Sequence, residues 1–401
     1  MKLRTKLYPH QEKALTFALS HPYHICGLEM GLGKSLVALA LAVETKARTL
    51  VICPAYLRKN WENEVSKHTE GLDVTIISYG SITKLESIDF DLVIADEFHF
   101  CKTPKAKRSE AVHDLLQNGK PKYFIGLTGS VIKNRVSEFW SLLQACYHGG
   151  HYDEFKPFYR LYYKFCNTFS NERTFDTGKF VVVRFDGIKN VERLKQLIAP
   201  VYIRMKTRDV IDLPKTNDIY ITSKQSKKYE ADLKEAFKLF KQDPNDAEYM
   251  SMKRANAFAK IKATISLAKD MLDQDEKVVI FSDHVDSTKA IAKALKCPYV
   301  VGSVNADKRG EIVDEFENGK HQAIAATIGS LSTGVNLTSA SKMIFNDTPF
   351  VGADIDQAKA RIWRIGQDKP CFYYYIVSSD FDKKLSDMIQ RKSKDIRKIY
   401  D

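Results

Sequence analysis

Short apolar runs and helix-like segments alternate along the first 130 residues of the chain. Apolar runs at 50–53, 74–78, 91–95 and 123–127 predict buried strands, because a strand covered on both faces reads as a nearly continuous apolar stretch. An amphipathic segment at 12–19 and an apolar segment at 36–43 predict helices between them. This alternation predicts a parallel, doubly wound α/β sheet, whose ligands bind at the carboxyl ends of the strands.

The same alternation returns in the second half of the chain. It predicts strands at 277–282, 299–301, 323–327 and 343–345, with helices at 287–295 and 308–316. A chain of 401 residues exceeds what one hydrophobic core usually holds. We therefore predict two domains, residues 1–215 and 216–401, the first with a helical insertion at about 139–200.

The chain between these two alternating regions has a different composition. Aromatic and basic residues interleave over 139–185, a pattern that suits either stacking on nucleic acid or packing within a small insertion. We favour packing. Residues 203–215 form a basic segment that looks like a linker able to contact phosphate, and 224–273 predict a pair of solvated helices.

Charge and cysteine content narrow the class of protein. Lys and Arg number 62 against 50 Asp and Glu, a formal charge of +12, which favours a polyanionic partner, nucleic acid before membrane. The seven cysteines include no C-x-x-C pair, which argues against a zinc site or a disulfide framework. With no apolar signal segment and no bilayer-spanning run, we expect an intracellular protein without membrane contact.

The first candidate site is the glycine-rich turn Leu-Glu-Met-Gly-Leu-Gly-Lys-Ser that begins at Leu28. Gly31 and Gly33 let backbone N–H groups approach phosphate oxygens, and Lys34 can reach the outer phosphates. The Ser35 hydroxyl is placed for a magnesium ion. Because the strict phosphate-loop pattern has glycine where this chain has Leu28, a helix entry without a ligand is the alternative.

Paired carboxylates follow the strand predicted at 91–95. Asp96 lies where it can hold magnesium, and Glu97 can orient or deprotonate an attacking water. Two adjacent acids also occur in ordinary exposed turns, but the upstream phosphate loop favours catalysis. The strand at 123–127 ends in Thr128-Gly129-Ser130, whose hydroxyl groups are suited to sensing the third phosphate.

Two arginines stand near the end of the second domain. Arg361 and Arg364 are three residues apart, which predicts one face of a helix. A guanidinium from a separate domain can act as an arginine finger on the charge that develops at the γ-phosphate. The alternative is a surface face of salt bridges. We favour the finger because the nucleotide site of the first domain contains no arginine.

These motifs, in this order, resemble those of the Swi/Snf-type ATPases, a branch of the superfamily-two helicases. The resemblance extends from Tyr8 almost to the C-terminus, and its most specific part is the Arg-x-x-Arg-x-Gly-Gln sequence that ends at Gln367. The matching segments are Gln11, 29–35, Cys53-Pro54, Asn60-Trp61, 96–99, 127–130, 204–215, 332–337 and 357–367. Phe98 departs from the family pattern, which has a small residue at this position.

The resemblance implies two RecA-like parallel-sheet lobes, a P-loop NTPase and superfamily-two helicase core, with ATP and Mg²⁺ in the cleft between them. It implies that the nucleotide is bound by Gln11, Met30, Gly31, Leu32, Gly33, Lys34 and Ser35, and the metal by Ser35 and Asp96. The catalytic and coupling residues it implies are Glu97, Asp96, His99, Thr128, Gln357, Arg361 and Arg364. The DNA contacts it implies are Lys59, Asn60, Lys102, Ser332 and Thr333.

The function that we predict is ATP-driven translocation on double-stranded DNA in repair, recombination or replication. The alternatives are a strand-separating DNA or RNA helicase and a non-translocating, ATP-switched nucleic-acid clamp. Branched and single-stranded DNA are further candidate partners. We expect a monomer in the cytoplasm of a bacterial, archaeal or virus-infected host cell.

Overall fold

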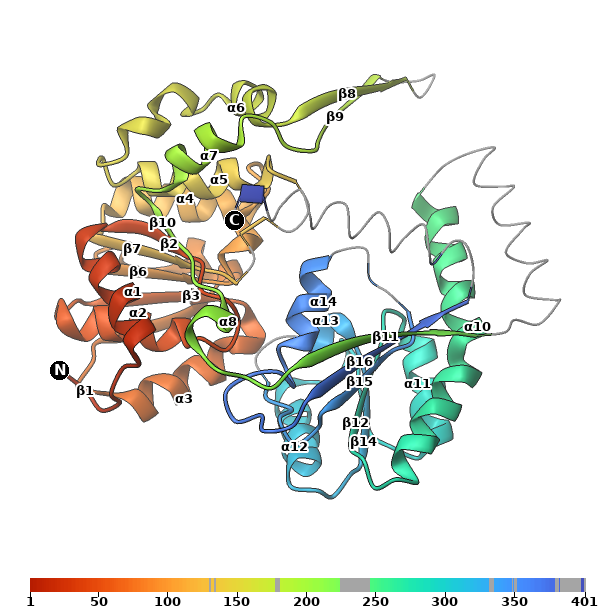
Figure 1. Ribbon diagram of the computed structural model, residues 1–401. Helices are drawn as coiled ribbons and strands as arrows, with labels where there is room; N and C mark the ends of the chain where they lie inside the picture. Colours follow the sequence, from red (N-terminus) through yellow and green to blue (C-terminus); the bar gives the residue numbers. More distant parts are fainter. Residues whose placement is uncertain are drawn as a thin grey trace. The chain divides into compact units, whose positions relative to one another are not determined.

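The computed structural model describes residues 1–129, 131–132, 135–176, 181–223, 246–331, 335–347, 349, 352–378, 382 and 398–399. By its contacts the chain forms two compact units, Met1–Ile211 with Arg391–Asp401, and Asp212–Gln390 (Figure 1). The division therefore falls after Ile211, whereas the sequence placed it after residue 215. Ile399, near the end of the chain, is buried in the core of the first unit.

The first unit is built on a six-stranded sheet in which all neighbouring strands are parallel. Its order is β10-β2-β7-β6-β3-β5. The strands are β2 (Tyr23–Cys26), β3 (Thr49–Cys53), β5 (Val74–Ser78), β6 (Leu92–Asp96), β7 (Tyr123–Leu127) and β10 (Tyr202–Ile203). A short antiparallel pair, β1 (Lys2–Leu3) and β4 (Thr69–Glu70), lies outside this sheet.

Helices cover both faces of this sheet (Figure 1). One face carries α1 (Pro9–Ser20), α2 (Lys34–Glu44) and α3 (Arg58–His68), and the other carries α4 (Lys107–Gly119) and α5 (Glu138–Tyr147). The apolar α2 sequence buries Leu39 and Leu41 against Ile94 on the first face. Phe139 of α5 belongs to the same buried cluster as Phe124 on the second. The result is the three-layer arrangement that the alternating pattern predicts.

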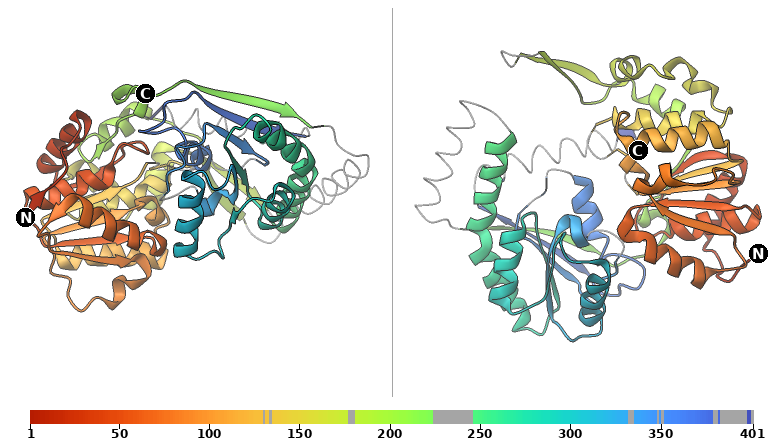
Figure 2. Two further views of the ribbon diagram at one scale, coloured as in Figure 1. Left: turned by 90° about the horizontal axis from the view of Figure 1, so that it is seen from below. Right: turned by 180° about the vertical axis from the view of Figure 1, so that it is seen from behind.

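The predicted insertion forms a compact extension of the first unit. It contains η4 (Asp153–Phe158), α6 (Tyr162–Phe169), the antiparallel hairpin β8 (Asn171–Asp176) and β9 (Val181–Asp186), and α7 (Val191–Ile198) (Figure 2). Tyr152, Phe155, Phe158, Phe165 and Phe169 are all buried in one cluster. For these five the burial confirms that they pack the insertion, whereas Tyr163 is 66% exposed. The hairpin was not predicted.

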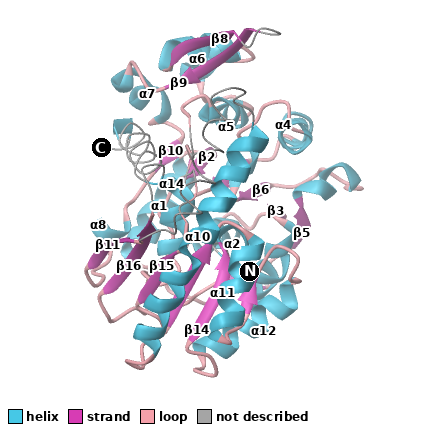
Figure 3. Cartoon of the chain, turned by 90° about the vertical axis from the view of Figure 1, so that its right-hand side faces the viewer, coloured by secondary structure: helices cyan, strands magenta, loops and turns pink. Residues whose placement is uncertain are grey.

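The second unit has its own six-stranded parallel sheet (Figure 3). Its order is β11-β16-β15-β12-β14-β13. The strands are β11 (Thr216–Thr222), β12 (Val278–Ser282), β13 (Tyr299–Val300), β14 (Ala323–Thr327), β15 (Lys342–Phe345) and β16 (Cys371–Val377). The helices are α10 (Asp246–Leu272), α11 (Val285–Leu295), α12 (Ala306–Glu317), α13 (Ile328–Leu331) and α14 (Gly352–Lys359). Two parallel α/β lobes are therefore present, as predicted.

The helix α10 corrects one expectation. The charged segment 224–273 was predicted to form a pair of solvated helices, of which 224–245 lie outside the described residues. The remainder is one long helix, and its Lys253, Asn256 and Lys260 are buried. Charged residues usually indicate a solvated helix, but these side chains contact polar partners inside the unit. Within the described part of the chain, no helix has the length and apolar character needed to cross a bilayer.

Candidate active site

The glycine-rich turn joins β2 to α2 and has the backbone of a phosphate-binding loop. Gly31 and Gly33 adopt left-handed conformations with φ of 84° and 75°, which glycine reaches without steric cost. A side chain at Gly33 would collide with the amide of Gln11. Because α2 begins at Lys34, the first-turn N–H groups and the positive end of the helix dipole lie at this loop, an arrangement that favours bound anions.

The ammonium of Lys34 lies within the loop. Its Nζ donates to the carbonyl oxygens of Leu28 at 2.9 Å and Glu29 at 3.4 Å. It also lies 3.5 Å from the position that a Cβ on Gly129 would occupy, after the end of β7. The loop and this strand end therefore both lie next to the Lys34 ammonium. The contact of Lys34 with nucleotide phosphates stays a prediction.

Gln11 fixes the loop from the first turns of α1. Its Nε2 donates to the Leu32 carbonyl at 3.1 Å, and its Oε1 accepts from the Tyr8 N–H at 3.0 Å. The ring of His10 places Nε2 3.1 Å from the same Leu32 carbonyl. Gln11 thus positions the phosphate loop directly, a contact that the sequence did not predict; its role in adenine recognition stays a prediction.

A polar clamp holds the loop on its other side. The Glu29 carboxylate accepts from Arg204 Nη2 at 3.1 Å and from the Thr207 N–H at 2.9 Å. The Glu29 N–H donates to the Met205 carbonyl at 3.0 Å. The segment predicted to be a linker, 203–215, therefore begins at the last residue of β10, which pairs with β2, and contains α8 (Thr207–Val210). The positive charge of Arg204 in this segment pairs with Glu29 of the loop. The two residues are far apart in sequence, so no local pattern predicts their pairing.

Asp96 ends β6 and is held by three donors. Trp61 Nε1 donates to its Oδ2 at 2.8 Å, and the Glu97 N–H donates to its Oδ1 at 2.9 Å. The Tyr79 hydroxyl donates to its backbone carbonyl at 2.8 Å. Burial and then the neighbouring Glu97 charge raise the pKa of Asp96 to about 7, although these hydrogen bonds and Lys34 favour the carboxylate. The contact with Trp61 was not predicted.

Glu97 belongs to a chain of polar side chains that joins two strand ends. It adopts a left-handed backbone, φ 50°, which is uncommon for a residue other than glycine and is often found at functional sites. His99 Nδ1 lies 3.1 Å from Glu97 Oε2 and 3.2 Å from Thr128 Oγ1. His99 and Thr128 are buried. The structure thus brings together three residues that the resemblance singled out.

Phe98 shows how the site accommodates its departure from the family pattern. Its ring is fully buried and packs edge-on against Phe124 at a centroid distance of 5.2 Å. A side chain at Gly126, in the middle of β7, would collide with this ring. The space for Phe98 is therefore supplied by a glycine in the neighbouring strand, and the backbone at Asp96 and Glu97 can keep its course.

The acidic strand end is suited to a divalent cation. Asp96 and Glu97 place two carboxylates side by side, and their repulsion contributes to the raised pKa of Asp96. Within the described residues, no group of three or more His, Cys, Asp or Glu side chains could hold a metal alone. Such a site fits Mg²⁺, which commonly takes one or two carboxylates and completes its shell with phosphates and water. Asp96 and Ser35 are the candidate ligands.

In the second unit, Arg361 and Arg364 follow α14 rather than lie within it. Each donates through Nη1 to the Val335 carbonyl, at 3.1 and 3.3 Å, and Arg361 Nε donates to the Gln357 carbonyl at 3.2 Å. The prediction of one continuous helix was wrong, because α14 ends at Lys359 and the chain continues in turns. Their common acceptor nevertheless brings the two guanidinium groups together; their role as fingers stays a prediction.

Comparison with known proteins identifies the family. The model of the SNF2-related domain matches residues 10–84 and 73–276, and that of the helicase conserved C-terminal domain matches 259–366. The chain belongs to the SNF2-related family. This confirms the resemblance to Swi/Snf-type ATPases and, with the two parallel sheets, the predicted fold class.

Relatives of this SNF2-related chain match nearly all of it. "DNA annealing helicase and endonuclease ZRANB3" of Bos taurus is 27% identical, over 98% of this chain and 40% of that protein. "SWI/SNF-related matrix-associated actin-dependent regulator of chromatin subfamily A-like protein 1" of Drosophila melanogaster is 24% identical, over 99% and 56%. The chain thus spans only about half the length of such relatives. The solved "Sulfolobus solfataricus SWI2/SNF2 ATPase core in complex with dsDNA" is 24% identical, covering 98% and 92%, with a TM-score of 0.43.

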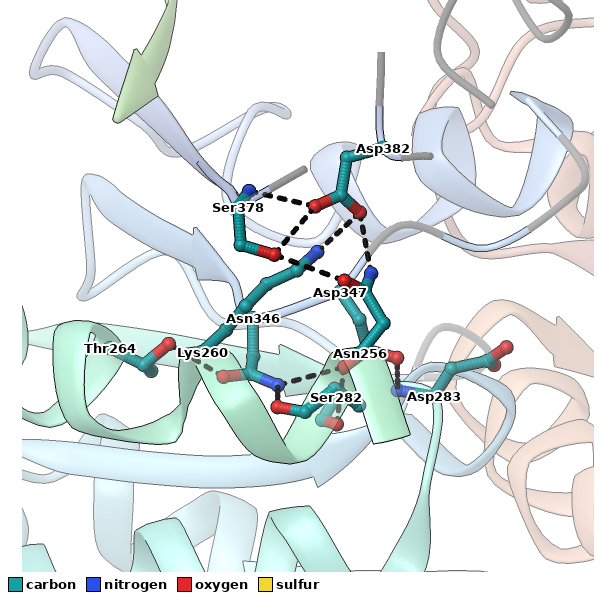
Figure 4. Close-up of polar contacts among 10 residues, drawn as sticks. Asn256, Lys260, Thr264, Ser282, Asp283, Asn346, Asp347, Ser378 and Asp382 are labelled. Atoms are coloured by element: carbon teal, nitrogen blue, oxygen red, sulfur yellow. Dashed lines mark hydrogen bonds and ion pairs between the residues drawn. The ribbon is translucent and has the colours of Figure 1, made fainter. Parts of the chain in front are cut away.

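The second lobe of this SNF2-related chain contains a buried polar network at the carboxyl ends of its strands (Figure 4). Asp347 accepts from the Ser282 hydroxyl at 2.5 Å and from the Asp283 N–H at 2.9 Å. Asn346 Oδ1 accepts from the Thr264 hydroxyl of α10 at 2.7 Å. These bonds attach α10 to the ends of β12 and β15.

A buried ion pair extends this network. Lys260 Nζ of α10 lies 2.6 Å from Asp382 Oδ1, with exposed side-chain fractions of 0% and 4%. Asp382 also accepts from Asn256 Nδ2 at 2.7 Å and from the Ser378 N–H at 2.8 Å. Because each charge has a partner of opposite sign and further hydrogen bonds, the pair avoids the cost of isolated buried charge. Sequence reasoning did not predict this network.

The predicted DNA contacts have different surroundings. Lys59 and Asn60 are exposed in the first turn of α3. Lys102 Nζ pairs with Glu138 Oε1 at 2.8 Å, so its charge is partly neutralised within the first unit. Ser332 and Thr333 lie outside the described residues. All of these contacts stay predictions.

Proposed function

We propose that this chain is a DNA-stimulated ATPase that moves along double-stranded DNA. The observation that carries the proposal is the convergence of the Lys34 loop with the Asp96–Glu97 strand end and the His99–Thr128 pair, in a chain of the SNF2-related family. A phosphate-binding turn supports nucleotide binding, and an acid joined to a histidine at the adjoining strand ends supports hydrolysis.

Each group of the site has a chemical task in this proposal. The loop N–H groups and Lys34 bind the phosphates, while Asp96 and Ser35 hold the metal. Bound Mg²⁺ supplies positive charge that offsets the charge on the phosphates. Glu97 Oε2 accepts a proton from the attacking water, and His99, at 3.1 Å, fixes the orientation of that carboxylate.

Three grounds support DNA as the partner. The net charge of +12 favours a polyanion. The first turn of α3 presents the exposed residues Lys59 and Asn60. The relatives are named as a DNA annealing helicase and as a regulator of chromatin. We extend this to a role in DNA repair, in a reducing compartment such as the cytoplasm, which suits seven free cysteines.

Strand annealing is the second candidate activity, favoured by the name of the ZRANB3 relatives. A motor that tracks a duplex can re-form base pairs behind it, whereas a strand-separating helicase opens them. A non-translocating clamp would hydrolyse ATP without displacing anything. These activities share one nucleotide site, so they differ in their nucleic-acid products and not in the chemistry at Glu97.

The experiment measures steady-state ATPase rates with duplex, branched and single-stranded DNA and with RNA. Two further assays measure displacement of a triplex-forming strand and annealing of complementary single strands. We expect strong stimulation by duplex or branched DNA together with triplex displacement. Stimulation by duplex without displacement indicates the clamp, and annealing indicates the second candidate. Stimulation by RNA alone overturns the proposal. Glu97→Gln serves as the hydrolysis-deficient control.

A further inference from the structure

Trp61 is a buried side chain that connects α3 to the candidate active site. It is 1% exposed and belongs to the core on the α1–α3 face of the first sheet. Its Nε1 donates to Asp96 Oδ2 at 2.8 Å. An indole N–H is a donor only, so it constrains a carboxylate oxygen without competing for a cation.

The two oxygens of Asp96 are held from two different segments of the first unit. Oδ1 accepts from the N–H of Glu97 and so follows the backbone after β6, while Oδ2 accepts from the helix α3. Tyr79 holds the main-chain carbonyl of the same residue. The rotation of the carboxylate is therefore determined by Trp61 and Glu97 together. A small displacement of α3 would change which lone pairs face the nucleotide site.

The same helical turn presents two exposed residues on its outer side. Lys59 and Asn60 immediately precede Trp61 in α3 and are exposed, whereas Trp61 points into the unit. Successive residues of a helix are rotated by about 100°, so one rigid turn can hold polar side chains in solvent and an indole in the core. A displacement of Lys59 or Asn60 that moves this turn of α3 would therefore also move the Trp61 side chain, which contacts Asp96.

We propose that Trp61 is a positioning residue that orients Asp96 for the divalent cation of the nucleotide and links that carboxylate to nucleic acid bound at the first turn of α3. This inference rests on the proposed function, because it assigns the cation and the DNA to the same residues. It adds a residue for which neither the family match nor the sequence motifs supply a role in the reaction.

A matched control lies in the same unit. Trp140 of α5 is 5% exposed, and its Nε1 donates to the Phe158 carbonyl at 2.9 Å. Trp61→Phe and Trp140→Phe therefore each remove a buried indole N–H and its hydrogen bond while keeping an aromatic ring. Their effects on stability should be similar. Only the Trp61 variant removes a donor from the candidate metal ligand.

The first measurement is the affinity for a fluorescent ADP analogue with Mg²⁺ and with EDTA. In wild type we expect Mg²⁺ to tighten binding. In Trp61→Phe we expect the affinity in EDTA to be unchanged and the tightening by Mg²⁺ to fall about tenfold, the effect of losing a hydrogen bond to a charged group. Trp140→Phe should retain the full tightening. The DNA-stimulated fold-increase in kcat should fall in Trp61→Phe at unchanged DNA affinity.

A second measurement leaves Trp61 in place, so it does not depend on the folding of Trp61→Phe. In Trp140→Phe/Trp363→Phe, Trp61 is the remaining tryptophan of the three. Paramagnetic Mn²⁺, added with ADP, should quench its fluorescence at the concentrations that tighten nucleotide binding, and Mg²⁺ should compete. Absence of quenching while Mn²⁺ still tightens binding overturns the inference.

Two different failures can be distinguished. Wild-type protein that binds no nucleotide, or whose ATPase ignores DNA, contradicts the proposed function and not the position of Trp61. Wild-type protein that behaves as proposed, with Trp61→Phe indistinguishable from Trp140→Phe in its Mg²⁺ dependence and DNA stimulation, overturns the inference about Trp61 alone.

Discussion

The clamp on Glu29 makes a quantitative prediction about the phosphate loop. Glu29→Gln removes the negative charge that Arg204 Nη2 and the Thr207 N–H share, but leaves one amide oxygen as an acceptor. Hydrogen bonds to charged groups contribute about 1.5–3 kcal/mol each. The Glu29 side chain is 31% exposed and that of Arg204 20%, so solvent weakens the pair. We expect the first unit to lose about 1–2 kcal/mol of unfolding free energy.

The assay is thermal unfolding followed by a double-mutant cycle. For a unit the size of Met1–Ile211, 1 kcal/mol corresponds to about 2–4 °C in Tm, so Glu29→Gln should lower Tm by about 2–8 °C. Combination with Arg204→Met should cost less than the sum of the two single changes, with a coupling of about 1 kcal/mol. ATP affinity should fall in parallel, because the clamp holds the phosphate loop.

The control is an ion pair at the surface of the same unit. Glu70 pairs with Arg4 at 3.6 Å, and both side chains are more than half exposed, so Glu70→Gln should change stability by less than about 0.5 kcal/mol. A Tm for Glu29→Gln no lower than that for Glu70→Gln, together with additive single changes, would refute the claim that the clamp stabilises the loop.

Three further outcomes test other parts of the structure. Glu97→Gln should keep ATP bound and lower kcat by about 10²–10⁴-fold; normal turnover would assign the base to another residue. Lys260→Met should destabilise by about 3–5 kcal/mol in urea unfolding because Asp382 loses its buried partner, and a second change, Asp382→Leu, should restore much of this. Burial lowers the pKa of His113 and of His148 to about 4. The unfolded chain therefore binds more protons between about pH 6.5 and 4, and unfolding free energy should fall as pH decreases, by up to about 2 kcal/mol per histidine at pH 5. His148→Gln should flatten this dependence, and a wild-type stability equal at pH 7.5 and 5 would contradict it.

Sequence patterns predicted the central strands because burial leaves a local signal. β3, β6 and β7 are apolar over nearly their whole length, and such runs can be recognised without knowing their neighbours. β10 contains only Tyr202 and Ile203, and it exists because the chain returns to pair with β2. β11, at the edge of its sheet, begins with three exposed residues and only then alternates half-buried and exposed ones. These strands form because they pair with strands that are distant in sequence. Such pairing leaves no local pattern from which the strands could be predicted.

The same distinction applies to the candidate site. Asp96, Glu97 and His99 lie within four consecutive positions, so the motif predicted that they lie together. Trp61 reaches Asp96 across 35 positions, and Arg204 reaches Glu29 across 175; only the parallel order of the strands brings these partners into contact. Contacts of this kind carry the positioning of the site, so a motif identifies the reacting groups without showing what orients them.

The strand ends of the two lobes differ in how their charges are compensated. In the first lobe burial and then the neighbouring Glu97 charge raise the pKa of Asp96 to about 7, so a cation bound there would favour the charged carboxylates. In the second lobe Lys260 neutralises Asp382, and Asp347 is satisfied by hydroxyl and N–H donors. Parallel sheets favour ligands at both sets of strand ends, but within the described residues only the first combines two adjacent carboxylates with a glycine-rich loop at a helix start. The two lobes share this topology, and the difference in charge supports the proposed metal site in the first lobe, whereas the polar groups of the second attach α10.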